Sequence, residues 1–445
     1  MIRLAVGICF PHMGKWIAET PDPRREHPSR KYELSLMMWT AMVMFVSQPG
    51  TRRQYDLDKG TTAFLLNVLA LAGLLPDSAS RLPTAEAVDD VLQKLDEDVF
   101  AKLRKRIVKA LIRGKRIESC KFNGFWRLAV DATSIHTSSK RHCPHCQTKT
   151  CSKTKMTTYH HNVLEFKLVS PDGLAISLHS EFLVKQDGES KQDSEIKAFY
   201  RAAPEIKRMW PHMKFIIMGD AAYGNANFMR ICKDNDWQYC VSLKDNLPTL
   251  RKAADAGLAS AKPKLHAPEP GVAQRLRFVE GLSHGGFRTH AVECVETKPD
   301  KNGEMKDTRF LWMTSLLPSR WCVVDVADDV GRQRWKIENQ GFNVQKNSGY
   351  RITHSYGSVG NAWRHYYLAA QVMHIIVQIA TTTDALHKLP SRRAIKRPGA
   401  PKPLLKIFKS MKNFVKRLAE AFRFNPPTWM DIAELGPIQL RRLTL

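Results

Sequence analysis

The chain has 445 residues, of which 43% are hydrophobic, so it is long enough to bury the cores of two or three domains. Its 69 Lys and Arg residues outnumber 43 Asp and Glu residues, and the formal net charge of +26 indicates a polyanionic partner. No run reaches the roughly 18 to 20 apolar residues that span a bilayer. The N-terminal segment has no A-x-A-like cleavage site, which argues against a signal peptide. Nine scattered cysteines, an odd number, indicate a reducing cytoplasm rather than a disulfide framework.

Residues 1–120 are predicted to form an all-helical region. Apolar helical runs cover 32–46 and 61–75, and 84–115 has helical periodicity behind Thr84, a good N-cap residue after Pro83. We expect this region to bind DNA or to mediate dimer contacts.

Residues 121–385 are predicted to form a mixed α/β domain. A Pro-Asp-Gly turn between two alternating segments is a strong hairpin signal, and a turn-rich, β-rich insertion is expected at about 250–315. A helix carrying Glu338 follows the insertion. The other expected elements are strands at 125–135, 215–220 and 237–244 and a helix at 193–210.

Residues 386–445 are predicted to form a basic linker and a C-terminal helix. From Ala385 onward there are 14 Lys and Arg residues against three acidic ones. Two interpretations stay open for the helix at 404–424, a solvated amphipathic helix and a nucleic-acid contact.

Three carboxylates carry the predicted chemistry. Asp131 and Asp220 end two predicted strands, and strand ends that open on one sheet edge are where α/β folds place reactive groups. Either aspartate alone could simply cap the next turn. Together with Glu338 they could bind two divalent cations, because Mg²⁺ takes carboxylate oxygens and two such ions can drive phosphodiester chemistry.

The segment from Arg334 to Tyr350 is predicted to be helical. Arg334, Glu338 and Gln345 would then share one face, because offsets of four and seven residues return to nearly the same azimuth. The plain alternative is an exposed ion pair between Arg334 and Glu338.

These three acids stand in the contexts LAVDATSI, MGDAAYGN and RWKIENQGFNVQK, with WMTSL before the last helix. Residues 125–380 thereby resemble the DDE transposases of prokaryotic insertion sequences, and in particular insertion-sequence group four, with its Tyr-x2-Arg-x3-Glu-x6-Lys signature. Arg334 and Glu338 match this signature. Gly331 stands at the Tyr position and Gln345 at the Lys position, with Lys346 next to it, which indicates a divergent branch.

The resemblance implies a ribonuclease H-like catalytic domain and an enzyme that cuts and joins insertion-sequence ends. It implies Mg²⁺ or Mn²⁺ held by Asp131, Asp220 and Glu338, and terminal-repeat and target DNA as partners. A homodimer on paired ends and a cytoplasmic, nucleoid-associated location are further expectations. The alternatives are a catalytically inactive DNA-binding protein on the same fold and a structure-selective DNA nuclease.

Five residues are candidates for supporting the acids or for touching DNA. A guanidinium one turn from Glu338 could hold its carboxylate or a phosphate, which is the role expected of Arg334. Lys346 could reach a phosphate on its flexible stem. For Lys244, Tyr223 and Asn225, contact with the DNA backbone and ordinary packing or turn chemistry are equally open.

The stretch HCPHCQTKTCSKTKMTTYHH contains a cysteine cluster. Cys143, Cys146, Cys151 and His160 have the C-x2-C-x4-C-x8-H spacing of a tetrahedral zinc site. His142 and His145 are competing ligands, and His160 and His161 abut the hairpin strand, so one of these two could be a core histidine. Free thiols in a basic loop and a redox pair stay open as alternatives.

Overall fold

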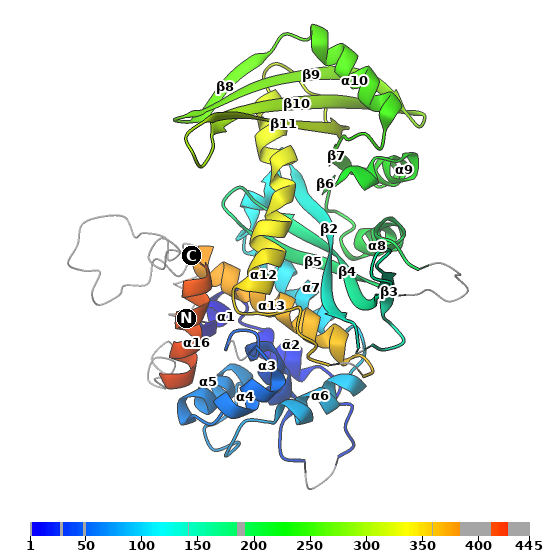
Figure 1. Cartoon of the computed structure of the whole chain (residues 1–445). Coiled ribbons are helices and arrows are strands. Elements are labelled where there is room, and N and C mark those ends of the chain that lie inside the picture. Colours follow the sequence, from blue (N-terminus) through cyan, green and yellow to red (C-terminus); the bar gives the residue numbers. More distant parts are fainter. Residues whose placement is uncertain are drawn as a thin grey trace, which may run out of the picture.

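The computed structural model describes residues 2–26, 30–47, 50–140, 142–184, 192–357, 359–382 and 411–425. Figure 1 shows three parts along the long axis, with a helical bundle at one end, the middle strands of a mixed sheet next to it, and at the other end further antiparallel strands of the same sheet with their own helix. The bundle contains α1 (Ile2–Cys9), α2 (Met13–Ala18), α3 (Leu34–Val43), α4 (Arg52–Asp58), α5 (Thr62–Ala72), α6 (Ala85–Lys94), α7 (Val99–Arg113), α13 (Ala362–Thr382) and α16 (Met411–Phe424).

The predicted N-terminal helices are present, and their starts follow the expected capping chemistry. The Thr84 side chain accepts a hydrogen bond from the Ala87 amide, and Thr61 caps α5 in the same way through Phe64. The periodic stretch 84–115 is two helices rather than one, because Leu95 adopts an extended backbone (φ −64°, ψ 145°) after α6. The short helices α1 and α2 were not predicted.

The C-terminal basic helix packs on this bundle. The Arg423 guanidinium pairs with Asp58 at 2.7 Å, the Asn67 amide donates to the Phe422 carbonyl at 2.9 Å, and the Phe422 ring lies edge-on to Phe64. One face of α16 is therefore buried, while its Lys and Arg side chains on the other face remain exposed. The predicted basic linker, the first part of the predicted helix up to residue 410, and the residues after 425 lie outside the described residues.

The central sheet has the order expected of a ribonuclease H-like fold. Strands β5, β4, β2, β6 and β7 are neighbours, with antiparallel pairs from β5 to β2 and parallel pairs from β2 to β7. Two helices, α8 and α9, connect the strands. The bounds are β1 (Lys121–Phe122), β2 (Phe125–Ser138), β3 (Gln147–Thr150), β4 (Thr157–Val169), β5 (Ala175–Leu183), α8 (Glu195–Met209), β6 (Phe215–Gly219), α9 (Ala226–Asp234) and β7 (Gln238–Ser242), with 3₁₀ turns η1 (Glu118–Cys120) and η2 (Ala221–Tyr223).

The mixed α/β class and the hairpin are confirmed, since Gly173 turns between β4 and β5 with φ +102°. The insertion continues the sheet because β11 pairs with β7. The insertion is rich in strands as predicted, but it opens with a helix that was not predicted. These elements are α10 (Pro248–Ser260), β8 (Lys264–Glu269), β9 (Val272–His284), β10 (Phe287–Pro299) and β11 (Met305–Thr314).

The helix expected to carry Glu338 is irregular. It runs through α11 (Val323–Asp325), the π-helical η3 (Val326–Val330), the 3₁₀ turn η4 (Gly331–Arg334), the π-helical η5 (Ile337–Phe342) and α12 (Asn343–Asn347). Figure 1 shows this segment crossing from the insertion to the bundle along one face of the sheet. None of the helices in the described ranges is both long and apolar enough to cross a membrane.

Candidate active site

The period of two along each strand directs both aspartates to the same face of the sheet. In β2, Leu128 and Val130 belong to the core shared with the bundle, whereas Ala129 belongs to a second core on the opposite face. Asp131 has the parity of Ala129. In β6, Ile216 and Met218 line that second core, and Asp220 follows with the same parity.

The register brings the two aspartates to the same level of the sheet. Ala129 is paired with Met218 in the parallel ladder, and Asp131 and Asp220 each follow two residues after this last pair. Asp131 does not end its strand as predicted. Strand β2 continues to Ser138 after its pairing with β6 has ended, so Asp131 stands where the parallel ladder stops.

Glu338 reaches this place from the helical segment that covers the second core. A single nitrogen of Arg334, Nη1, donates to Asp131 Oδ2 at 3.2 Å and lies 3.0 Å from Glu338 Oε1. The Arg334 side chain is 14% exposed, and that of Glu338 is 44% exposed. The ion pair between Arg334 and Glu338 is therefore more than an isolated pair on the surface. The same guanidinium also donates a hydrogen bond to Asp131, which is 203 residues away in sequence.

A fourth carboxylate, Glu195, lies at the first position of α8, and the sequence reasoning missed it. Burial, together with the negative charge of Asp220, raises the pKa of Glu195. The charge of Glu195 acts in turn on Asp131. Its only sequence signal is an acid directly after the N-cap Ser194, which is also the ordinary place for an acid on a helix.

The site holds more negative charge than its one guanidinium offsets. Burial and the nearby Glu338 carboxylate raise the pKa of Asp131 to about 7, against the lowering effect of Arg334. The described carboxylates do not enclose one point, since Arg334 lies between two of them.

The residue after Glu338 that faces the site is Lys346 and not Gln345. Gln345 is fully buried, where its amide nitrogen donates to Gln371 at 2.8 Å and lies 3.1 Å from His374 Nδ1. The prediction that Arg334, Glu338 and Gln345 share one helix face is thus wrong for Gln345. Lys346 is half-buried, and burial lowers its pKa while the charge of Asp131 opposes this.

The π-helical turn η5 explains the displacement. A π-turn inserts one residue into a helix, so the azimuth that lies seven residues past Glu338 in a regular helix is reached eight residues past it. Lys346 therefore takes the direction that residue 345 would have in a regular helix. The residue types in Ile337–Phe342 do not predict a π-turn. The sequence alone therefore did not predict that Lys346 would take the place of Gln345.

The other departure from the signature also has a packing cause. A Cβ added to Gly331 would lie 2.6 Å from the Trp312 indole, so no larger residue fits there without a shift. Trp312 on β11 fills the space beside the start of η4, and Phe310 stacks near it at 5.9 Å between ring centroids. The residue at the signature Tyr position is small because an aromatic from the insertion occupies its place.

Three further candidates have distinct outcomes. Lys244 is exposed just after β7. Tyr223 is 1% exposed and packs edge-on to Phe199, which favours packing over DNA contact, the two interpretations left open for it. Asn225 caps α9, since its Oδ1 accepts from the Phe228 amide at 3.0 Å and from the Tyr200 hydroxyl at 2.8 Å, which is the turn chemistry left open for it.

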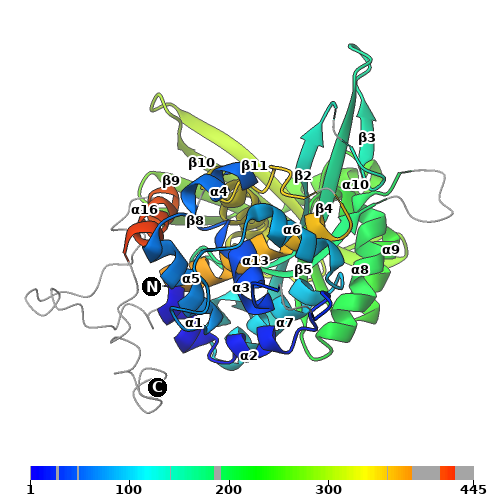
Figure 2. The same cartoon turned by 90° about the horizontal axis from the view of Figure 1, so that it is seen from below.

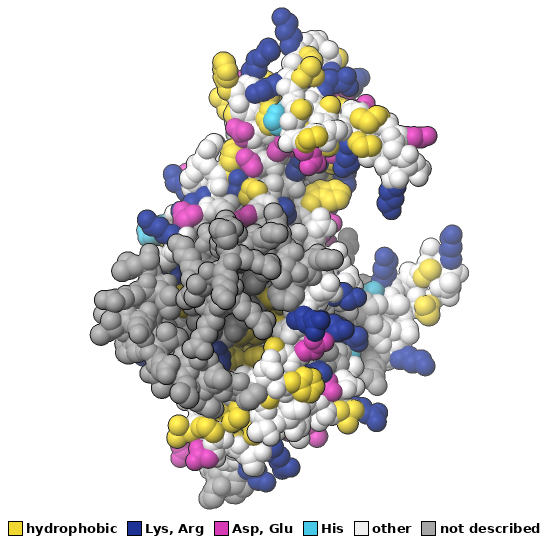
Figure 3. Space-filling view, turned by 90° about the vertical axis from the view of Figure 1, so that its left-hand side faces the viewer, with side chains coloured by type: hydrophobic (Ala, Val, Ile, Leu, Met, Phe, Trp, Pro, Cys, Tyr) yellow, Lys and Arg dark blue, Asp and Glu magenta, His cyan; other side chains and the backbone are white. Residues whose placement is uncertain are grey.

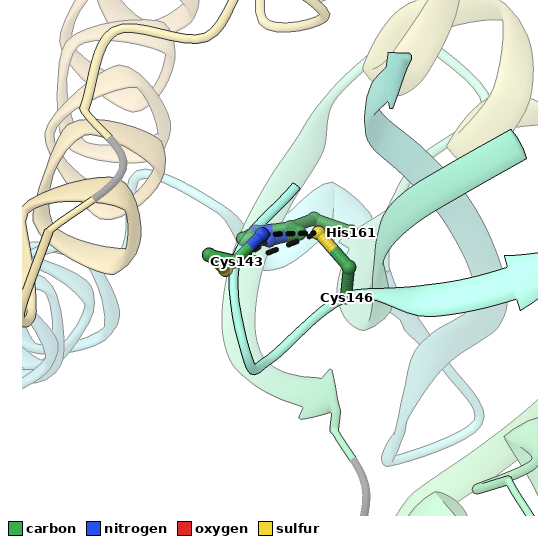
Figure 4. A group of neighbouring side chains, drawn as sticks. All are labelled: Cys143, Cys146 and His161. Atoms are coloured by element: carbon green, nitrogen blue, oxygen red, sulfur yellow. Dashed lines mark hydrogen bonds between the residues drawn. The ribbon is translucent and has the colours of Figure 1, made fainter. Parts of the chain in front are cut away.

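Cysteine and histidine side chains do cluster in this stretch, but the residues that come together differ from the predicted set. Cys143, Cys146 and His161 offer three ligand atoms that all lie within 4.8 Å of one another (Figure 4). Cys151 is exposed, and His160 instead lies 2.8 Å from the Thr158 hydroxyl and 3.1 Å from that of Thr137. Neighbouring residues on a strand face opposite sides, so only one of the two adjacent histidines can point at the thiols.

The surface near these groups is hollowed. Figure 2 shows the outer part of β2, β3 and β4 projecting from the same side of the molecule as the turn between β10 and β11. In Figure 3 the surface is concave between these two projections, with Lys and Arg side chains on both margins. Exposed lysines on the first projection are Lys149, Lys153 and Lys155, and those on the second include Lys301 and Lys306.

The fold and the acids together define a ribonuclease H-like domain of the DDE type. A family model described as a transposase DDE domain matches residues 123–357, just over half of the chain. The chain belongs to this family of transposases. No curated protein matches it.

Proposed function

We propose that this chain is a DNA transposase that cuts and joins the ends of an insertion sequence, with Asp131, Asp220 and Glu338 holding two Mg²⁺ or Mn²⁺ ions. The observation that carries the proposal is the shared Arg334 nitrogen, which binds Asp131 and Glu338 from elements far apart in sequence. The parity and register of β2 and β6 support the inclusion of Asp220.

The donor set fits hard divalent cations. Carboxylate oxygens are the protein ligands that Mg²⁺ prefers, and burial, together with the nearby Glu338 carboxylate, raises the pKa of Asp131 to about 7. Two such ions, when bound, activate a hydroxyl or water and stabilise the leaving oxygen of a phosphodiester. Glu195, whose pKa is raised by burial and by Asp220, is a candidate for a supporting ligand.

The basic residues have separate roles in this proposal. Arg334 holds Asp131 and Glu338 in place when cations are absent, and its fork of donors suits a DNA phosphate when they are present. Lys346 faces Asp131 and supplies the contact that the family signature assigns to its lysine. Lys244 and the lysines on the margins of the hollow provide backbone contacts without base specificity.

We assign the remaining parts of the chain by their packing and charge. The helical bundle, which includes the N-terminal 120 residues and receives α13 and α16, would bind terminal-repeat DNA or pair two copies of the chain on the two ends. The catalytic domain would cover about 121–385, with its insertion bounding the hollow. Such an enzyme acts on chromosomal DNA in a prokaryotic cytoplasm.

The test is a cleavage and strand-transfer assay on DNA that carries the element's ends, with Mg²⁺ or Mn²⁺. Glu338→Gln should abolish cleavage and leave DNA binding nearly unchanged. Glu86→Gln, at an exposed position in the first turn of α6, is the matched control. A Glu338→Gln protein that cuts at the wild-type rate would remove this residue from the site.

The products separate the proposed enzyme from its two alternatives. Joined products identify a transposase, whereas metal-dependent cuts without joining identify a nuclease on the same scaffold. Binding of the DNA ends without any metal-dependent cut identifies a DNA-binding protein that has lost catalysis.

A further inference from the structure

A second group of metal-ligating side chains lies outside the carboxylate site. It belongs to a projection that we call the arm, formed by residues 134–140 and 142–161, which comprise the outer part of β2, strand β3 and the start of β4. Figure 2 shows the arm standing away from the body of the molecule. At its base, Cys143, Cys146 and His161 point toward one another (Figure 4).

The spacing of the two sulfur atoms matches a tetrahedral ion, and the imidazole nitrogen lies close to them. The two sulfur atoms are 3.9 Å apart, and Cys143 Sγ lies 3.1 Å from His161 Nε2. An ion about 2.3 Å from each sulfur in a tetrahedral site would hold them roughly 3.8 Å apart. A disulfide would need the sulfurs at about 2.05 Å, so the pair is placed for a shared ligand and not for a bond.

The backbone between Cys143 and Cys146 forms a turn that holds both thiols on one side. The Cys146 amide donates to the Cys143 carbonyl at 3.1 Å, and the Cys143 amide donates to Cys146 Sγ at 3.4 Å. The turn thus brings both sulfurs to one side and directs a backbone donor at one of them. Such donors stabilise the negative charge of a metal-bound thiolate.

The cluster joins the arm to the helical bundle. The His161 ring packs edge-on against Trp363 of α13 at 4.3 Å between centroids, and Trp363 also packs against Phe182 of β5. The cluster lines a cavity of about 440 Å³ between the arm and the bundle. Beyond it the arm has little apolar core, since β3 and the following turn are almost wholly exposed.

We propose that Cys143, Cys146 and His161 bind a structural Zn²⁺ ion that fixes the basic arm against the helical bundle. Two thiolates and an imidazole are the usual donors of structural zinc. For the fourth position the geometry favours His136, which is paired with His161 across β2 and β4, has its ring 5.8 Å away and lines the same cavity. His142 also lines the cavity but stacks on Tyr159 at 4.3 Å.

The metal itself supplies the first test. Full-length protein purified without chelator under reducing conditions should contain one zinc per chain, and Co²⁺ exchanged into it should show the absorption of tetrahedral thiolate coordination. Cys143→Ser and Cys146→Ser should weaken Zn²⁺ binding by more than about 100-fold, because loss of even an outer-shell partner costs about 10- to 100-fold.

Matched controls distinguish this site from the spacing-based set. Cys151→Ser and His160→Ala alter neighbouring thiol and imidazole groups that do not belong to the cluster, and both proteins should keep their zinc. Zinc lost with Cys151→Ser but retained with Cys143→Ser would overturn the proposal. So would a reduced wild-type protein without metal, or one in which the two cysteines form a disulfide.

The fourth ligand and the role of the ion are tested separately. His136→Ala should weaken zinc binding while His142→Ala does not, and the reverse result would overturn the assignment of His136. Removal of zinc from the wild-type protein should speed tryptic cleavage at Lys149, Lys153 and Lys155 but not in the strands outside the arm. Unchanged cleavage would overturn the bracing role. None of these measurements requires the protein to cut DNA, so they stand apart from the transposase proposal.

Discussion

The carboxylate site and the thiolate site lie along one pair of strands, with Asp131 in β2 and His161 in its neighbour β4, yet they are built in opposite ways. Asp131, Asp220 and Glu338 come from three elements that are distant in sequence, and a guanidinium lies between two of the carboxylates. Cys143, Cys146 and His161 come from one arm, within 19 residues, and no charged group separates them.

This difference matches the two kinds of ion. A catalytic site for Mg²⁺ keeps room for water and substrate phosphate, so its carboxylates need not close around the metal before DNA arrives. A structural zinc site is closed by its own ligands and contributes directly to folding. The first should therefore lose its metal easily, and the second should retain it.

The largest effect is expected from the acids. Asp131→Asn or Glu338→Gln should lower strand cleavage by at least about 10³-fold, because members of a catalytic unit are not replaced by their neighbours. Zinc content should be unchanged in both proteins. Cleavage rates and zinc content measured for each variant would show whether the two sites are independent. Loss of zinc from either variant would contradict their independence.

Selective metal removal is the next test. Dialysis against a weak chelator should abolish cleavage, and Mg²⁺ or Mn²⁺ should restore it while zinc stays bound throughout. The physical reason is that carboxylates and water hold Mg²⁺ loosely whereas thiolates hold Zn²⁺ tightly. If Zn²⁺ rather than Mg²⁺ restored cleavage, the division between the two sites would be wrong.

Lys346 and Gln345 are adjacent residues with opposite predicted consequences. Lys346→Ala should slow cleavage roughly 10- to 100-fold with normal stability, since a hydrogen bond to a charged group is worth about 1.5–3 kcal/mol. Gln345→Leu should instead lower the free energy of unfolding by about 1–3 kcal/mol, because Gln371 and His374 lose a buried partner. Cleavage kinetics and urea unfolding of both variants would check the assignment, and the opposite pattern would refute the π-turn explanation.

Features that depend on residues close together in the sequence could be predicted, whereas features that depend on distant residues could not. The strands around Asp131 and Asp220 and the Pro-Asp-Gly hairpin are set by local patterns and were predicted. The π-turn before Gln345 and Lys346 follows from packing on both sides of the helix, which no local pattern encodes.

The choice of His161 over His160 has a similar cause. It depends on which face of β4 turns toward the thiols, and the spacing of the ligands alone does not contain that information. The role of Glu195 depends on α8 starting beside Asp220, a contact between elements that the sequence does not bring together.

Gly331 tests the packing between the insertion and the Glu338 segment. Gly331→Ala should cost about 1–3 kcal/mol of unfolding free energy, because its Cβ would lie 2.6 Å from Trp312. A second change, Trp312→Phe, should recover part of the loss. Urea unfolding of the two variants would measure this coupling, and equal stability of Gly331→Ala and wild type would show that the indole moves freely.

The smallest predicted effect is the pH dependence of an ion pair, between Glu296 and Arg332, at the same contact between the insertion and the Glu338 segment. Burial alone would raise the pKa of Glu296, but hydrogen bonds from Arg332 and Lys298 lower it to about 2. Because this pKa lies below the ordinary value of about 4.3, the stabilisation is present above pH ~4.5 and is lost as pH falls through 2. Glu296→Gln should thus be less stable than wild type at pH 7, by about 1–2 kcal/mol, and the gap should shrink below pH ~4.5. A gap that widens on acidification would contradict this.

The most direct test of two distinct metal sites is anomalous scattering from a crystal of the chain bound to its DNA ends, grown with Mn²⁺ and without chelator. We predict manganese beside Asp131, Asp220 and Glu338, with Arg334 moved from between the carboxylates, and zinc at Cys143, Cys146 and His161. Manganese absent from the carboxylates, with Arg334 still joining Asp131 and Glu338, would contradict the account.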